Sequence, residues 1–195
     1  MLVMPFDSRS TFTVTGIDPG SNSLGVSTFY LDVDSLQIVK SEAMTYVGAN
    51  LGKNTFHTKL HGDRIGRIHG HKENLLRYFE LERPFLIASE APFVSRAHPL
   101  AGLVLTEVIE AIRSAMYEYD KSKDIYLIDP PTVKNAVGAA GNAPKEKVRE
   151  KVMQLPDLNY QGVIPLALLD EHGLDSLAVG YCLVTRLRNL RNSHV

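Results

Sequence analysis

Cysteine is almost absent from the 195 residues, because Cys182 is the only one, and a single cysteine excludes an intrachain disulfide. No apolar run approaches the roughly 20 residues that a membrane-spanning helix requires. Residues 1–10 also lack the basic-then-apolar order of a signal peptide. We therefore expect a cytoplasmic protein without a membrane partner, in a compartment that keeps thiols reduced. Because Cys182 lies in an apolar, helix-like stretch, we expect it in the core and not as a nucleophile.

Strong net charge is also lacking, since the chain carries −1 at neutral pH, and this excludes a global electrostatic attraction to nucleic acid. The local balance differs from the total. Five basic residues and two acids lie between Lys134 and Lys151, which gives this segment a charge of +3. The stretch that starts at Tyr181 adds Arg186, Arg188 and Arg191 and contains no acid.

Repeats and low-complexity linkers are absent, and the composition is that of one globular domain. Hydrophobic residues make up 44% of the chain and charged residues 22%, so 195 residues can bury a sizeable core. Two domains would be cramped in this length. We therefore predict a single domain that spans residues 1–195.

The pattern of apolar residues predicts an α/β domain. Period-two alternation and short apolar runs predict strands at 11–18, 23–31, 36–47, 84–89 and 124–129. Helical spacing predicts helices at 56–83, 100–119, 132–137, 145–155 and 172–190. Leading strands followed by alternating helices and strands describe a mixed sheet that is flanked by helices.

The long helix predicted at 56–83 contains glycines and histidines at regular spacing. Its glycines recur every four residues, at Gly62, Gly66 and Gly70. Each costs about 1 kcal/mol relative to alanine, so something must approach that face closely, and we favour helix-on-sheet packing over a ligand groove. Its histidines are His57, His61, His69 and His71. No cysteine or acid completes a zinc pattern, so we interpret these histidines as surface residues.

Carboxylates stand where two predicted strands end. Asp18 closes the first strand just before Pro19 and Gly20, and Glu90 closes the fourth. A partly buried charge needs a partner, and the usual partner is a metal ion. The alternative for Asp18 is a turn residue that bonds its own backbone, as aspartate often does in such bends.

More acids and a histidine open the last predicted helix. Asp170 and Glu171 fit an acidic helix start, which the helix dipole favours. Asp175 lies about a turn inside the helix, beside core residues, and His172 or Glu171 can share its face. Two strand-end acids with one or two helix ligands form the donor set of a two-metal phosphodiesterase site, in which Mg²⁺ or Mn²⁺ binds. The sequence offers no credible nucleophile triad.

The order of these motifs resembles the RuvC family of Holliday junction resolvases, within the RNase H-like superfamily. The similar segments span nearly the whole chain and are Gly16–Gly20, Ile87–Glu90, Val133–Gly138 with Gly141–Lys145, and His172–Ala178. The last segment is similar to an Asp-x-x-Asp-Ala-Leu-Ala motif, with His172 in place of the first Asp. Three roles for His172 stay open at this point: metal ligand, general acid or base, and phosphate contact.

The resemblance implies an RNase H-like α/β fold with a five-stranded mixed sheet, three antiparallel leading strands and then parallel strands. It implies catalytic and metal-binding roles for Asp18, Glu90, His172 and Asp175, with two Mg²⁺ ions, replaceable by Mn²⁺, and no small-molecule cofactor. It also implies DNA contacts by Phe93, Lys134, Lys145 and Lys147. Phe93 would stack on a base, and its alternative is a loop residue tucked into the core. The lysines would hold phosphates.

The implied activity is that of a structure-selective DNA endonuclease, which resolves four-way junctions by paired symmetric nicks. A two-fold junction demands two active sites, so we expect a homodimer. The extra length around residues 48–55 suggests a phage member, in a bacterial or phage-infected cell. Alternatives are a branch or flap nuclease or a ribonuclease of the same fold, and a catalytically weak junction-binding protein. An actin-like ATPase also begins with a similar strand turn but needs a second glycine-rich phosphate motif, which we do not find.

Overall fold

A computed structural model describes residues 10–50, 55–92 and 99–193. Within this part of the chain lies one five-stranded sheet in the order β3-β2-β1-β4-β5. Its strands are β1 (Thr11–Asp18), β2 (Ser23–Asp32), β3 (Ile38–Val47), β4 (Leu86–Glu90) and β5 (Ile125–Ile128). Strands β1, β2 and β3 are antiparallel neighbours, whereas β4 runs parallel to β1 and β5 runs parallel to β4. The predicted mixed sheet is thus confirmed.

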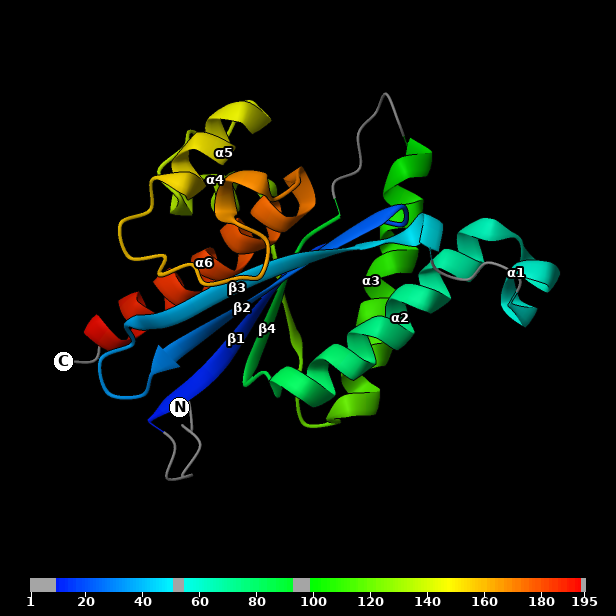
Figure 1. Cartoon of the computed structure of the whole chain (residues 1–195), viewed down its shortest axis with the longest axis horizontal. Helices are drawn as coiled ribbons and strands as arrows, with labels where there is room; N and C mark the ends of the chain where they lie inside the picture. Colours follow the sequence, from blue (N-terminus) through cyan, green and yellow to red (C-terminus); the bar gives the residue numbers. More distant parts are fainter. Residues whose placement is uncertain (1–9, 51–54, 93–98, 194–195) are drawn as a thin grey trace.

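Helices cover both faces of the sheet (Figure 1). They are α1 (Phe56–His61), α2 (Asp63–Glu82), α3 (Pro99–Tyr119), α4 (Pro130–Ala136), α5 (Lys145–Met153) and α6 (Glu171–Asn192), with short 3-10 turns η1 (Gly48–Asn50) and η2 (Leu166–Leu168). Helix α6 packs across β1 and β2 on one face, with α4 and α5 beside it. Helices α2 and α3 pack together on the other face. The described helices include none that is long and apolar enough to cross a membrane.

Alternating side chains of the strands build a separate apolar core on each face. Phe29 of β2 packs with the α6 side, where Leu177 and Cys182 are buried. Val26 of β2 packs on the opposite face, where Ile112 of α3 is buried. Each fully buried side chain of the Leu, Ile or Phe type contributes roughly 1.5–3 kcal/mol, so both helical layers are held firmly. The burial of Cys182 confirms its predicted core position.

The helix predicted as one unit at 56–83 is in fact two helices, and this prediction was wrong. Gly62 takes a φ of 86°, ends α1 and precedes α2. Side-chain-bearing residues rarely adopt this backbone, so glycine permits the break. Gly66 is where the second helix meets the first, because a Cβ added there would lie 2.0 Å from Oγ1 of Thr58. The close approach that the glycine spacing predicts is therefore helix on helix at this position.

The histidines of this region divide into two groups. His57 and His69 stack with ring centroids 3.8 Å apart, and both are partly exposed. His71 is only 1% exposed, so its interpretation as a surface residue was wrong. The reason lies in the tertiary structure, because His71 faces the hairpin between β1 and β2, and its Nε2 lies 3.2 Å from the carbonyl oxygen of Ser21.

Candidate active site

Asp18 and Glu90 are the last residues of two adjacent strands, β1 and β4. The parallel register pairs Ile17 with Ser89, which places the next residue of each strand side by side. Parallel strands end at the same edge of a sheet, and ligand sites of α/β folds form there. The structure thus brings together the two strand-end carboxylates that the sequence singles out.

Glycines in the strands let α6 lie directly on the sheet. A Cβ added to Gly25 would lie 2.0 Å from the carbonyl oxygen of His172, and one added to Gly16 would lie 2.3 Å from the backbone nitrogen of Gly180. The first turn of α6 therefore lies beside the end of β1, and His172 and Asp175 come with it. A glycine inside a strand marks such a close approach, and this signal was missed in the sequence.

The start of α6 is fixed by its N-cap. Asp170 accepts a hydrogen bond from the backbone nitrogen of Gly173 at 2.9 Å, which confirms its predicted place at the helix start. The same Oδ1 atom accepts a second hydrogen bond from Oγ1 of Thr45 at 2.6 Å. Because Thr45 belongs to β3, the cap also ties the helix to the sheet. A lost cap typically costs about 1 kcal/mol.

His172 lies against Asp18, with its Nδ1 atom 2.7 Å from Oδ2 of the carboxylate. The side chains are 27% and 14% exposed, so the pair is partly shielded from water. The hydrogen bond with Asp18 is the main cause that raises the pKa of His172, and the charge of Asp18 adds to it. In a protonated imidazole both ring nitrogens carry hydrogen, so His172 offers a lone pair to a metal only in its neutral form. Metal ligation by a protonated His172 would release a proton.

Glu90 and Asp175 are acids that tend to keep their protons. Burial, followed by the charge of Asp18, raises the pKa of Glu90 to about 7 and that of Asp175 to about 6. Asp175 adds a further raising effect on Glu90. Three carboxylates thus act on one another inside a partly buried site, and perturbed acids of this kind mark functional sites.

The chemistry of this donor set fits a divalent cation. Carboxylates that raise one another's pKa repel each other when they are ionised. A hard cation bound by their oxygen atoms supplies the positive charge that offsets this repulsion. In the present side-chain arrangement, however, the described residues contain no group of three or more His, Cys, Asp or Glu side chains placed to hold one ion. Asp18 is instead engaged by His172.

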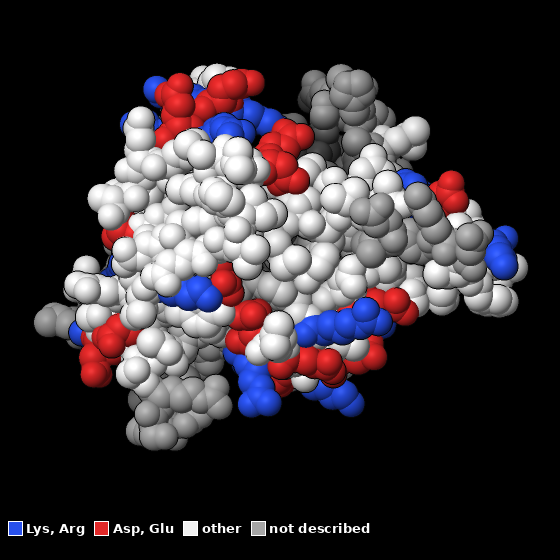
Figure 2. Space-filling view, viewed as in Figure 1, with Lys and Arg blue, Asp and Glu red and all other residues white. Residues whose placement is uncertain are grey.

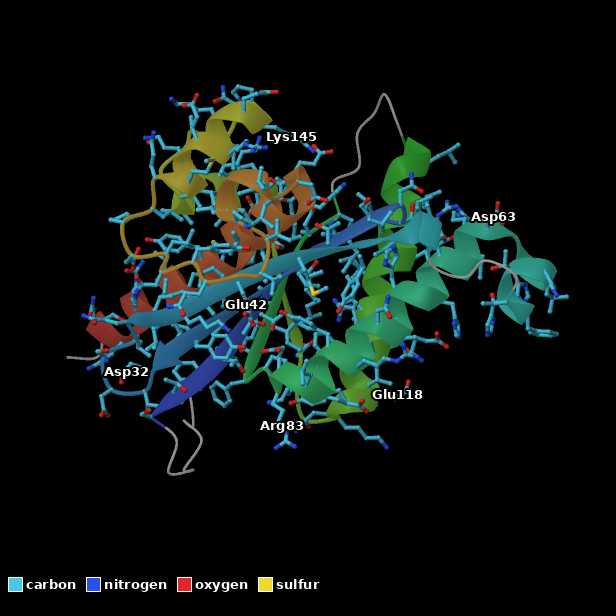
Figure 3. All side chains as sticks on the ribbon, in the orientation of Figure 1. Asp32, Glu42, Asp63, Arg83, Glu118 and Lys145 are labelled. Atoms are coloured by element: carbon cyan, nitrogen blue, oxygen red, sulfur yellow. The ribbon has the colours of Figure 1, made fainter. Side chains whose placement is uncertain are left out.

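The predicted DNA-contacting lysines differ in their distance from the acids. Lys145, labelled in Figure 3, stands at the start of α5. It forms ion pairs with Glu171 at 2.8 Å and with Asp175 at 3.9 Å. Lys134 donates to the carbonyl oxygen of Ala143 at 2.7 Å, and its charge offsets part of the rise in the pKa of Glu90.

Two more of the predicted contacts stand apart from the acids. Lys147 forms its ion pair with Glu150 on its own helix at 2.7 Å, so the structure does not draw it toward the carboxylates. Phe93 lies outside the described residues. Glu171 fits an acidic helix start and can share a helical face with Asp175, but its ion pair with Lys145 was missed because the two residues lie 26 positions apart.

Charge on the face shown in Figure 2 is unevenly spread. Blue and red side chains gather together over α5 at the top and along the lower edge of the view, and a smaller blue and red pair lies over β3, which carries the ion pair of Lys40 and Glu42. Mixed signs over α5 agree with its sequence, in which Glu146 and Glu150 alternate with basic residues. Local groups of lysine, and not a broad positive field, must therefore provide any attraction to phosphate.

The chain is similar to known proteins at the level of structure. No protein-family model and no curated protein matches the chain. The structure of Thermus thermophilus RuvC is similar, with a TM-score of 0.63, 24% identity, and coverage of 91% of this chain and 96% of that one. The same protein in complex with a Holliday junction substrate gives a TM-score of 0.62 at 23% identity, with the same coverage. The yeast mitochondrial Holliday junction resolvase Ydc2 gives 0.60 at 11% identity, covering 93% of this chain and 84% of that one.

These likenesses and the sheet order define an α/β protein with the RNase H-like fold. Within that class, the chain has the fold of RuvC over nearly its whole length. The resemblance that the sequence motifs indicate is thereby confirmed for the fold.

Proposed function

We propose that this protein is a structure-selective DNA endonuclease that resolves four-way junctions by paired symmetric nicks. The observation that carries the proposal is the meeting of Asp18, Glu90 and Asp175 at one edge of a RuvC-like sheet. Two proteins of the same fold are named as junction resolvases or were solved with a junction.

Mg²⁺, or Mn²⁺ in its place, would be held by Asp18, Glu90 and Asp175. His172 would join these ligands in its neutral form. When bound, two such ions would activate a water molecule and stabilise the leaving 3′ oxygen. The protein's own part is to orient these donors and to keep the site partly shielded. The charge repulsion among the acids supports this assignment, since the binding of cations relieves it.

Lys134 and Lys145 are proposed to hold the phosphates beside the acids, with Lys147 further along α5 and Phe93 stacked on a base. Lys145 is well placed because it already forms an ion pair with Glu171 across the site. Both partners are largely exposed, so this ion pair is worth little and a phosphate can compete for the lysine. These contacts position DNA without reading its sequence.

Substitution of Asp175 by Asn tests the proposal. The change keeps the shape of the side chain but removes the negative charge, so Mg²⁺-dependent cleavage of a four-way junction should be abolished while junction binding persists. Gel-based cleavage and mobility-shift assays on one fixed junction measure both. As a control, Asp157→Asn alters an acid that pairs with Arg188 away from the site and should leave cleavage intact. Undiminished cleavage by Asp175→Asn contradicts the proposal.

A second candidate is a junction-binding protein with weak or no cleavage. The hydrogen bond between His172 and Asp18 favours it, because it occupies a carboxylate that a metal would need. Binding without cleavage in both Mg²⁺ and Mn²⁺ would support this candidate. Substitution of His172 by Asp, which makes the motif resemble the family pattern more closely, should then create cleavage activity.

A further inference from the structure

The turn that follows Asp18 is held by two groups from outside its own hairpin. This turn spans residues 19–22 and joins β1 to β2. The backbone nitrogen of Gly48, in η1, donates to the carbonyl oxygen of Asn22 at 2.6 Å. The Nε2 atom of His71, in α2, lies 3.2 Å from the carbonyl oxygen of Ser21. The turn is therefore fixed to two separate elements.

His71 can donate in this contact only when its Nε2 atom carries a proton. A backbone carbonyl accepts but cannot donate, so Nε2 must carry the proton. Nδ1 is buried and has no hydrogen-bond partner among the described residues. Burial, with the charge of Arg67 one helical turn earlier, lowers the pKa of His71. The lowered pKa favours the neutral ring, and the contact with Ser21 then requires the single proton on Nε2, the nitrogen that faces the turn.

The second contact depends on a glycine. A Cβ added to Gly48 would lie 2.8 Å from the carbonyl oxygens of both Ser21 and Asn22. Any other residue there would push η1 off the turn. Close backbone approach is a reason to find glycine at such a position, and here it brings η1 against the same carbonyl that receives its hydrogen bond.

The position of Asp18 depends on this turn because the backbone of β1 has a paired strand on only one side at that point. Asp18 pairs with Gly25 of β2, but the ladder between β1 and β4 ends one residue earlier, at Ile17 and Ser89. Beyond Asp18 the backbone direction is decided by the turn. A shift of about 1 Å in a reacting group can cost on the order of a hundredfold in rate.

We infer that His71 is a positioning residue for Asp18, which acts by anchoring the turn through the carbonyl oxygen of Ser21. His71 touches neither the carboxylate nor the substrate. This inference rests on the proposed nuclease function for its effect on rate, although the anchoring itself does not require that function.

The test compares two substitutions of His71 with one of His69. His71→Leu fills the space without a donor, whereas His71→Gln keeps an N–H where Nε2 stands. We expect His71→Leu to slow single-turnover cleavage of a four-way junction about ten- to a hundredfold, with unchanged junction binding, and His71→Gln to restore most of the rate. His69→Leu, on a partly exposed face of the same helix, should cleave at the wild-type rate. Cleavage by His71→Leu at the wild-type rate, or equal impairment of both His71 variants, overturns the inference.

Two structural readouts separate this inference from the proposed function. Nitrogen-15 NMR of the imidazoles should show His71 as the neutral Nε2–H tautomer near neutral pH, even if His71→Leu fails to fold. Amide exchange at residues 20–23 should be faster in His71→Leu than in wild type. If wild-type protein cleaves no junction, the proposed function fails and these two measurements still decide whether His71 anchors the turn. An Nδ1–H tautomer, which leaves Nε2 without a proton to donate to Ser21, refutes the anchor.

Discussion

Glu90 is an acid whose surroundings disfavour its ionised form. Burial and the neighbouring carboxylates of Asp18 and Asp175 raise its pKa from 4.5 to about 7. The folded protein therefore binds this proton more tightly than the unfolded chain does. Stability that depends on Glu90 is present at low pH and is lost as the pH rises from about 4.5 through about 7.

Replacement of Glu90 by Gln should for this reason stabilise the protein without metal. In the presence of a chelator, we expect the free energy of unfolding to rise on the order of 1 kcal/mol at about pH 8 and to change little at about pH 4. Urea denaturation at the two pH values measures the difference. Glu150→Gln is the control, because the hydrogen bond with Lys147 lowers the pKa of Glu150 and this change should not stabilise. A Glu90→Gln variant no more stable than wild type at high pH would show that repulsion at the site is negligible.

Helix α6 is the element on which the candidate site depends most. The first turns of α6 contain its N-cap, its close contacts with glycines of β1 and β2, and its ion pair with α5. Oγ of Ser27 adds a buried hydrogen bond of 2.7 Å to the carbonyl oxygen of Ser176. The helix carries His172 and Asp175, so any change that lifts it from the sheet also moves half of the site.

Gly16→Ala should lift α6 in this way. The new methyl group would collide with the backbone of Gly180, and backbone atoms cannot turn aside, so we expect a loss of about 1–3 kcal/mol in the free energy of unfolding. Gly173→Ala is the matched control in α6, because its methyl group would meet side-chain atoms at 3.2 Å or more. Its stability should change by less than about 1 kcal/mol. Equal effects of the two substitutions in chemical denaturation would refute the role of Gly16 as a seat for the helix.

The molecule as a whole has little net charge to attract DNA. With a net charge of −1, any binding of DNA must rely on local lysines. One site makes one nick, and a four-way junction that is resolved symmetrically requires a second site.

We therefore expect a homodimer that cuts opposing strands at symmetric positions. Sedimentation equilibrium should give twice the 21.6 kDa chain mass. Denaturing gels should map paired nicks on a fixed four-way junction, with Mg²⁺ and then with Mn²⁺. Three-way DNA and RNA–DNA hybrids serve as comparison substrates. Equal cleavage of these would favour the branch nuclease or ribonuclease alternatives.

Most element positions could be predicted because they depend on neighbours in the chain. The alternation in β1 predicts both of its ends correctly, and the start of α5 follows Pro144 as expected. The helix break at Gly62 escaped prediction because a glycine inside a helical pattern costs only about 1 kcal/mol and is often tolerated. Its φ of 86° depends on how α1 folds back on α2.

Some features of the candidate site can likewise be predicted from neighbours in the chain, whereas others depend on residues that are distant in the sequence. The sequence alone determined the order of the strands and helices along the chain. It singled out Asp18 and Glu90 as acids at the ends of apolar strands, and Asp175 as an acid inside a helix beside core residues, because these patterns are visible from neighbours in the chain. Only the tertiary structure decided that His172 binds Asp18 across 154 positions, that His71 is buried against the turn, and that glycines seat α6. Burial and pairing are properties of segments that meet in space, and a local pattern does not contain them.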